Sequence, residues 1–192
     1  MKQALLIMDM QVGIVERVGD NGRDLLDREA RAIAAARGAG VPVIYVRVAF
    51  RDGYPEVSQR NRTFSALAGA HGFTEQDAAT QIHPEVAPQP GEVIVLKRRV
   101  SAFTGSDLSV VLSAAGVESL VLTGIATSGV VLSTLREAAD RDFDLVVLAD
   151  ACGDADGEVH RVLTEKVFPR QAEVTTVAEW AAGLGAATPG GG

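Results

Sequence analysis

Three ionisable side chains stand at the ends of short apolar runs in this chain. Asp9 follows the run ALLIM, Lys97 closes VIVLK, and Asp150 closes LVVLAD. If these runs are parallel strands of one sheet, their carboxyl ends share an edge, where open parallel sheets bind ligands. An acid and a base that meet at a buried edge shift each other's pKa values, as acid–base catalysis requires. Two plainer interpretations stay open: an aspartate at a strand end is commonly a turn residue, and a lysine in a KRR run commonly faces solvent.

The segment TGIATSGVVLSTLREA, residues 123–138, is a second candidate for chemistry. It is a glycine-containing turn between an apolar run and a helical pattern. Backbone amides at the start of a helix can receive an anion or a developing oxyanion. If the first and fourth apolar runs are neighbours, Asp9, Lys97 and this turn converge.

The elements that must position these groups alternate along the chain. Helical spacing of apolar residues predicts helices at 24–37, 107–115, 128–141 and 157–168. Continuous apolar runs predict strands at 4–8, 41–49, 93–97, 119–123, 145–150 and 173–177. Strands that are apolar throughout and separated by helices indicate a parallel sheet covered on both faces. We therefore expect an α/β fold, a three-layer, Rossmann-like sandwich around a six-stranded parallel sheet.

One connection, residues 50–91, is far longer than the others. It contains several prolines and a basic cluster of Arg51, Arg60 and Arg62. Long connections with little regular structure are often lids or binding loops. These arginines are candidates for clamping a substrate carboxylate, although they could equally face solvent.

Length and composition narrow the class of protein. The 192 residues suit one domain, expected at 1–185, with a small-residue flexible tail at 186–192. A net charge of −7 argues against nucleic acid as a partner. The single cysteine, Cys152, permits no intrachain disulfide, and no apolar run approaches the ~20 residues of a membrane span. We expect a cytoplasmic protein.

Three segments together resemble the isochorismatase-like, or cysteine hydrolase, family. They are ALLIMDMQVGIV, VIVLKRRVSAFTGSDL and LVLTGIATSGVVLSTLREAADRDFDLVVLADAC, and the similarity runs from about residue 4 to residue 180. The resemblance implies a six-stranded parallel sheet and hydrolase activity. Amidases of this family use an aspartate, a lysine and a cysteine, and Asp9 and Lys97 match the first two. The cysteine position is Val130, and the family's cis peptide would fall at Ile125–Ala126.

Valine has no nucleophilic atom, so three hypotheses remain open. In the first, the protein is a hydrolase without a covalent intermediate, like isochorismatases in which the acid form of the aspartate protonates a vinyl ether; Asp9 would be that acid. In the second, it is an amidase that uses another nucleophile, such as Ser128 or Cys152. In the third, it binds a small metabolite without turning it over.

The expected ligand is a small carboxylated molecule. No G-x-G-x-x-G turn follows the first run, and the three histidines, His71, His83 and His160, show no ligand spacing. We expect no cofactor and no metal, and the resemblance implies a homodimer or homotetramer. The substrate-binding candidates are Gln11, Arg51, Arg60, Arg62, Phe103, Ala126, Thr127 and Ser128.

Overall fold

A computed structural model describes residues 1–19 and 21–186 as an α/β domain. The strands are β1 (Gln3–Met8), β2 (Val43–Val48), β3 (Val93–Lys97), β4 (Ser119–Ile125), β5 (Asp144–Gly153) and β6 (Glu173–Thr175). The helices are α1 (Val12–Val15), α2 (Asn21–Gly38), α3 (Arg62–Ala70), α4 (Leu108–Ala115), α5 (Leu132–Ala139), α6 (Gly157–Val162) and α7 (Val177–Ala186). The tail expected at 186–192 lies outside the described residues, except that Ala186 ends α7.

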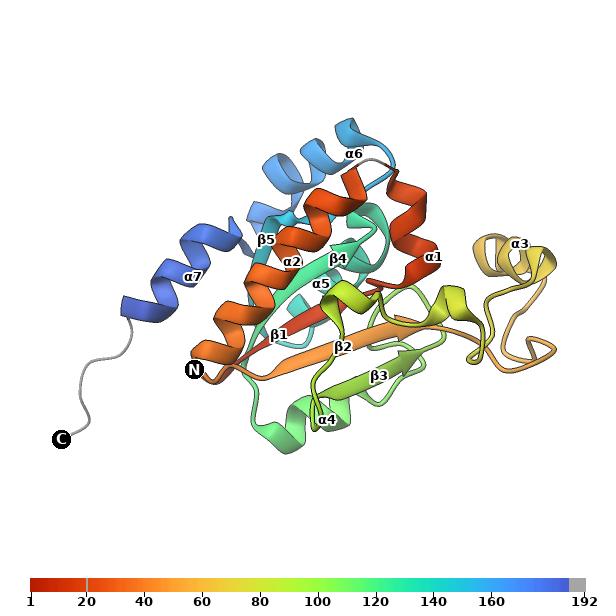
Figure 1. Cartoon of the computed structure of the whole chain (residues 1–192), viewed down its shortest axis with the longest axis horizontal. Coiled ribbons are helices and arrows are strands. Elements are labelled where there is room, and N and C mark those ends of the chain that lie inside the picture. The colour runs from red at the N-terminus through yellow and green to blue at the C-terminus, as the bar shows by residue number, and fades with distance from the viewer. Residues whose placement is uncertain (20, 187–192) are drawn as a thin grey trace.

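All six strands form one parallel sheet in the order β3-β2-β1-β4-β5-β6 (Figure 1). The predicted fold class is confirmed. The strand order reverses between β1 and β4, so the connections that leave their carboxyl ends go to opposite faces of the sheet, and such a switch point leaves a crevice between them. This edge is therefore the place where the fold itself favours a ligand site.

Successive side chains of the central strands serve two separate cores. Leu5 and Ile7 of β1 pack under α2 and α7, whereas Leu6 and Met8 pack against the side covered by α4 and α5. All four side chains are buried, and Figure 1 shows the helices on the two faces of the sheet. In a strand that is buried on both faces, neither set of alternating side chains meets water, which explains the continuous apolar runs.

The ends of β1 and β4 approach closely at one glycine. Gly124 has φ +127°, and a Cβ atom built there would lie 1.9 Å from the carbonyl oxygen of Met8. Only glycine permits this approach, because the space and the backbone conformation both exclude a side chain. The contact brings the residue after β1 next to the turn after β4.

Strand β5 is longer than predicted, and this changes the place of Asp150. The pairing of β4 with β5 shifts between Leu122 and Gly124, because β5 carries extra residues there. β5 then continues to Gly153, so Asp150 lies inside the strand. Its carboxylate accepts a hydrogen bond of 2.8 Å from the backbone N–H of Val177, at the start of α7. The expectation that Asp150 stands at the ligand edge was wrong.

The long connection between β2 and β3 has more structure than predicted. It contains α3, whose first turn is capped by Asn61: the side-chain oxygen accepts a 3.1 Å hydrogen bond from the N–H of Phe64. Phe50, Phe64 and Phe73 pack with Val48 into a small core of their own. The segment is thus a folded insertion, and Figure 1 shows α3 standing out from the end of the sheet.

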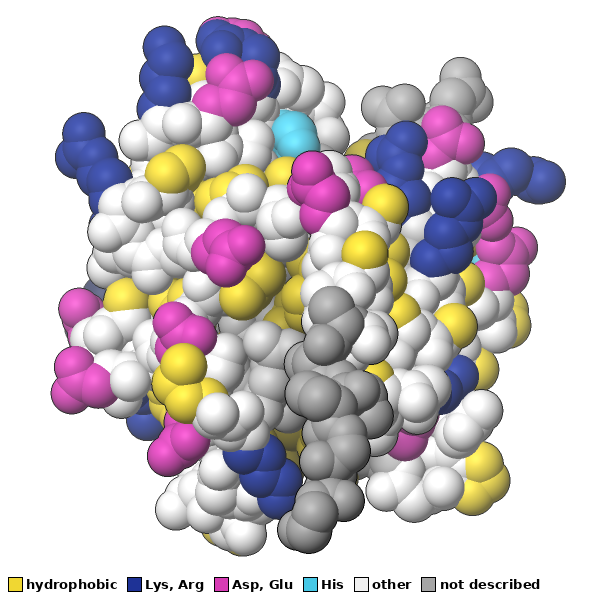
Figure 2. Space-filling view, turned by 90° about the vertical axis from the view of Figure 1, so that its left-hand side faces the viewer, with side chains coloured by type: hydrophobic (Ala, Val, Ile, Leu, Met, Phe, Trp, Pro, Cys, Tyr) yellow, Lys and Arg dark blue, Asp and Glu magenta, His cyan; other side chains and the backbone are white. Residues whose placement is uncertain are grey.

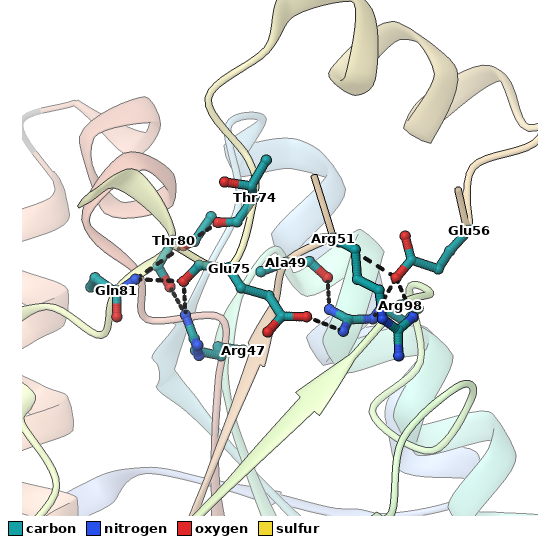
Figure 3. Close-up of polar contacts among 9 residues, drawn as sticks. All are labelled: Arg47, Ala49, Arg51, Glu56, Thr74, Glu75, Thr80, Gln81 and Arg98. Carbon is teal, nitrogen blue, oxygen red and sulfur yellow. Dashed lines mark hydrogen bonds and ion pairs between the residues drawn. The ribbon is translucent and has the colours of Figure 1, made fainter. Parts of the chain in front are cut away.

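Arg98, directly after β3, joins this insertion to the sheet (Figure 3). Its guanidinium donates to the carbonyl of Ala49, pairs with Glu75, and lies 3.3 Å from the carboxylate of Glu56. Arg51 pairs with the same Glu56 carboxylate at 2.6 Å. The network ties both halves of the insertion to one sheet edge, so the insertion can hold side chains over that edge.

The opposite end of the sheet has a different surface. Figure 2 faces the amino ends of the strands, where acidic and basic side chains are scattered and the visible hydrophobic areas are small. None of the helices in the described ranges has the length and hydropathy needed to cross a membrane.

We expect Gly124→Ala to lower the free energy of unfolding by about 3 kcal/mol or more, since the new methyl group must push β1 away from β4. Urea unfolding followed by circular dichroism measures this. The matched control is Gly69→Ala in α3, where an added Cβ meets open space; we expect it to change stability by less than about 1 kcal/mol. Equal stabilities for the two variants would contradict the close approach.

Candidate active site

A buried ion pair lies at the carboxyl edge of the sheet. Asp9 follows β1, and Lys97 is the last residue of β3. Because β2 lies between these strands, the lysine side chain spans the end of β2, and its Nζ reaches Asp9 Oδ2 at 2.8 Å. The convergence of Asp9 and Lys97 expected from the sequence is therefore present.

The ammonium group of Lys97 has all three of its hydrogens engaged. Besides Asp9, Nζ donates to the carbonyl oxygens of Arg99, at 3.1 Å, and Val100, at 2.9 Å. An ammonium group has three donors and no acceptor. Lys97 therefore has no donor left for a ligand, and its contact with Asp9 fixes the orientation of the carboxyl group.

Only one of the two carboxyl oxygens of Asp9 has a polar partner among the described residues. Asp9 is 5% exposed and Lys97 is 1% exposed. Oδ2 binds the lysine, whereas the buried Oδ1 has no hydrogen-bond partner among the described residues. Burial raises the pKa of Asp9, and it outweighs the charge and hydrogen bond of Lys97, which lower it. Oδ1 is thus an atom that can hold a proton and offer it.

Asp9 opens into a cavity of about 300 Å³ with predominantly apolar walls. Val130 is part of the wall and is 2% exposed, so a branched hydrocarbon occupies the position that resembles the family's cysteine. A carboxyl group in such surroundings is poorly solvated in its charged form. The lining residues are Asp9, Ile14, Arg17, Val18, Val48, Thr63, Phe64, Lys97, Val100, Ile125, Ala126, Gly129, Val130, Asp154 and Ala155.

The turn after β4 forms one side of this cavity. The peptide bond Ile125–Ala126 is cis, as the resemblance implied. A π-helical turn at Thr127–Val131 follows and leads into α5. The N–H of Ser128 donates to the carboxylate of Asp154 at 2.7 Å. That amide, which the sequence offered as an anion receiver, is therefore already occupied by a carboxylate of the protein.

Several predicted substrate contacts lie elsewhere. The side chain of Gln11 is fully buried and forms three hydrogen bonds, two with the backbone of Val48 and one with the carbonyl of Thr80, so it ties the insertion to β2. Thr127 is buried, and its hydroxyl lies 2.8 Å from Nδ1 of His160. Phe103 is buried on the α4–α5 side of the sheet, with the guanidinium of Arg141 4.6 Å from its ring centroid.

The arginines of the insertion are also outside the cavity lining. Arg51 pairs with Glu56, while Arg60 and Arg62 are exposed, and Arg62 begins α3. Of the predicted substrate-binding residues, Ala126 is the one that lines the cavity. The direction of a long, solvated side chain is decided by its tertiary partners, which the sequence did not reveal.

The other candidate nucleophiles do not line the cavity either. Cys152 is buried, its Sγ lies 3.9 Å from the carbonyl oxygen of Leu122, and burial raises the pKa of the thiol well above its usual value. A thiol in that state is a poor nucleophile. The Ser128 side chain is outside the lining, and the hydroxyl present in the described lining belongs to Thr63.

Two charged residues of the cavity were missed by sequence reasoning. Arg17 lies in a short 3₁₀ segment after α1, and Asp154 directly follows β5. Arg17 gave no signal, because α1 has only four residues and no side-chain cap. For Asp154, the run DADG after the fifth apolar run could have marked a turn at the ligand edge.

Within the described ranges, no group of three or more His, Cys, Asp and Glu side chains is arranged to hold a metal ion. A larger hollow of about 590 Å³ lies near the amino ends of β1 and β4, and its lining includes Met1, Glu118 and Arg141. Its charged side chains are exposed to solvent. It lacks the buried acid and base of the carboxyl edge, so that edge is the candidate active site.

Comparisons with known proteins bear on the family and the fold. The family described as the isochorismatase domain matches residues 3–179. The isochorismatase family protein YecD of Escherichia coli O157:H7 is 31% identical over 180 residues, or 92% of this chain and 93% of that protein. The ureidoacrylate amidohydrolase RutB of Methylobacterium radiotolerans is 31% identical over 210 residues, or 94% of this chain and 79% of that protein. The structure of an isochorismatase family protein from Burkholderia thailandensis has a TM-score of 0.83 at 30% identity and covers 96% of each chain.

Lys97→Met tests the electrostatics of the pair. Without the ammonium, burial alone acts on Asp9, so the folded-state pKa of its carboxyl group rises further. A folded-state pKa above the unfolded value, about 3.9, means that stability is lost as the pH rises through the folded pKa. We expect a loss of about 3–5 kcal/mol at pH 7 and a smaller loss at pH 4, measured by urea unfolding.

The double variant Asp9→Asn/Lys97→Met is the control for this experiment. It carries no buried charge at the site, so we expect its loss to be smaller at pH 7 and independent of pH. A loss for Lys97→Met that is the same at both pH values would show that Asp9 does not titrate in this way.

Proposed function

Because the chain belongs to the isochorismatase family, a family of hydrolases, we propose that it hydrolyses a small carboxylated vinyl ether without a covalent intermediate, with Asp9 as the general acid. The single observation that carries this proposal is the buried, unpartnered Oδ1 of Asp9, a residue that lines an apolar cavity while Lys97 holds its Oδ2 at 2.8 Å. An acid needs a proton at neutral pH, and burial favours the protonated form of Asp9.

The reaction begins with proton transfer to carbon. Asp9 Oδ1 gives its proton to the terminal CH₂ of the enol ether, and the electron pair of the C=C bond forms the new C–H bond. The CH₂ becomes CH₃, and an oxocarbenium ion remains at the ether carbon. As the proton leaves, Asp9 becomes a carboxylate beside the ammonium of Lys97, so this ion pair stabilises the charge that develops in the transition state.

Water completes the reaction and restores the acid. Its oxygen bonds to the ether carbon, and one of its protons returns to Asp9. The resulting hemiketal collapses: the C–O bond to the leaving group breaks, and the hydroxyl proton passes to the leaving oxygen. The products are an alcohol and a 2-oxo acid, and the only co-reactant is water. No step needs a nucleophile at Val130.

The amidohydrolase name of RutB, a relative at 31% identity, raises the alternative of amide hydrolysis. That chemistry as the family performs it needs a thiolate, and the described cavity wall offers the hydrocarbon of Val130 at that position. Removing a nucleophile typically costs orders of magnitude in rate. The cavity lining therefore favours vinyl-ether hydrolysis over amide hydrolysis. If the protein turns over no vinyl ether, the hypothesis that it only binds its ligand is favoured instead.

We expect wild type to release pyruvate from 2-phenoxyacrylate, a simple carboxylated vinyl ether, and Asp9→Asn to lower kcat by about 10²–10⁴-fold. Asparagine keeps the shape of Asp9 but has no acidic proton. A lactate dehydrogenase-coupled assay measures the release. Asp107→Asn, at an exposed aspartate whose side chain forms no capping hydrogen bond, is the control with unchanged kcat. Absence of pyruvate with wild type, or full activity in Asp9→Asn, would refute the proposal.

Val130→Cys tests the loss of covalent chemistry. The new thiol would stand at the wall beside Asp9 and Lys97, so we expect this variant to gain slow hydrolysis of ureidoacrylate, with an acyl adduct visible by intact-protein mass spectrometry. Val130→Ala opens similar space without sulfur and serves as the control, with no adduct. An adduct on wild type would show that another residue acts as nucleophile and would replace the proposed mechanism by an amidase mechanism.

A further inference from the structure

We propose that Arg17 binds the substrate's carboxylate and restricts the cavity to monocarboxylates. This inference rests on the proposed function, which it deepens by naming the group that recognises the substrate. It assigns to a residue next to α1 the role that the sequence gave to Arg51, Arg60 and Arg62 of the insertion.

The argument starts from the donors available in the cavity. The charged residues among those that line it are Asp9, Arg17, Lys97 and Asp154. The ammonium group of Lys97 donates its three hydrogens to Asp9 and to two backbone carbonyls. A guanidinium has five N–H donors, and its fork matches a carboxylate. Arg17 is thus the cation in the described lining that can bind an anionic ligand.

Arg17 is an exposed residue of the cavity lining, and its guanidinium has an aromatic neighbour. Its guanidinium carbon lies 5.7 Å from the centroid of the Phe73 ring, within the range of a cation–π contact. Phe73 belongs to the small core of the insertion, together with Phe64, which itself lines the cavity. The insertion therefore contributes to substrate binding through an aromatic support for Arg17 instead of through its own arginines.

The acidic groups decide which way a substrate enters. Asp9 lines the cavity and is the proposed proton donor. Asp154 lies on the wall after β5, where its carboxylate accepts the N–H of Ser128. Charge repulsion disfavours a substrate carboxylate near Asp154, so the carboxylate points towards Arg17 and leaves the reacting carbon to the protonated Asp9.

The same balance of charge limits the substrate to one carboxylate. Arg17 is the cation with free donors in the described lining, and Asp154 is a fixed carboxylate. A second carboxylate of the ligand would therefore find no cationic partner there. The body of the substrate meets apolar side chains, including Val48, Val100 and Val130. The class that fits is an enol ether with one carboxylate and an apolar substituent.

The experiment compares an acid with its neutral amide. With 2-phenoxyacrylate, we expect Arg17→Met to raise KM by about ten- to hundredfold while kcat stays within a few-fold. With 2-phenoxyacrylamide, which has no charge for Arg17 to bind, the same variant should leave KM unchanged. Arg17→Lys should restore part of the affinity for the acid, since it keeps the charge and loses the fork.

Two further variants test position. Arg60→Met removes an exposed arginine outside the lining and should leave KM unchanged. Phe73→Leu removes the ring under the guanidinium and should raise KM for the acid less than Arg17→Met does. An equal rise for Arg60→Met, or a rise for the amide as large as for the acid, would overturn the assignment of Arg17.

A binding measurement separates this inference from the proposed function. The saturated acid 2-phenoxypropanoate cannot react, so calorimetry reports its binding whether or not the enzyme turns over vinyl ethers. We expect wild type to bind it and Arg17→Met to bind it at least tenfold more weakly. If wild type does not bind it, or binds it no better than Arg17→Met, Arg17 is not the carboxylate site, even where pyruvate release succeeds. If binding depends on Arg17 but no pyruvate forms, the vinyl-ether reaction alone is refuted.

Discussion

The site depends on the contact between Asp9 and Lys97, which is held almost free of water. Taking an ammonium and a carboxyl group out of solvent is costly, and their attraction offsets this only when the remaining polar atoms are satisfied. Lys97 meets that condition through two backbone carbonyls, whereas Asp9 leaves Oδ1 without a partner. The unsatisfied atom therefore belongs to the acid, and that acid is a residue of the cavity lining.

Val130 lines the same cavity as Asp9 and Lys97, and its apolar side chain suits acid catalysis by Asp9. An apolar wall lowers the local dielectric, which favours the protonated carboxyl group and strengthens its interaction with the lysine once it has lost the proton. Sulfur at the same position would serve a covalent reaction through a thiolate. Val130 and the unpartnered carboxyl oxygen of Asp9 are therefore both consistent with the proposed non-covalent mechanism.

The insertion between β2 and β3 supports the site from outside the sheet. Its aromatic residues form a separate small core, and Arg98 fastens it to the edge next to Lys97. Gln11, two residues after Asp9, forms buried hydrogen bonds with β2 and with the insertion. The insertion thereby brings Phe64 to the cavity and Phe73 under Arg17, although its own arginines point elsewhere.

The sequence by itself determined the sheet and the meeting of Asp9 with Lys97. These follow from buried apolar runs and from the common edge of parallel strands. Tertiary structure alone decided that Asp150 lies inside β5, because the extra residues of that strand appear only in its pairing with β4. It also decided that Arg17, and none of the arginines at 51, 60 and 62, lines the cavity. A long charged side chain carries no periodic signal, and its direction is set by partners such as Phe73 and Glu56 that are distant in the chain or belong to irregular segments.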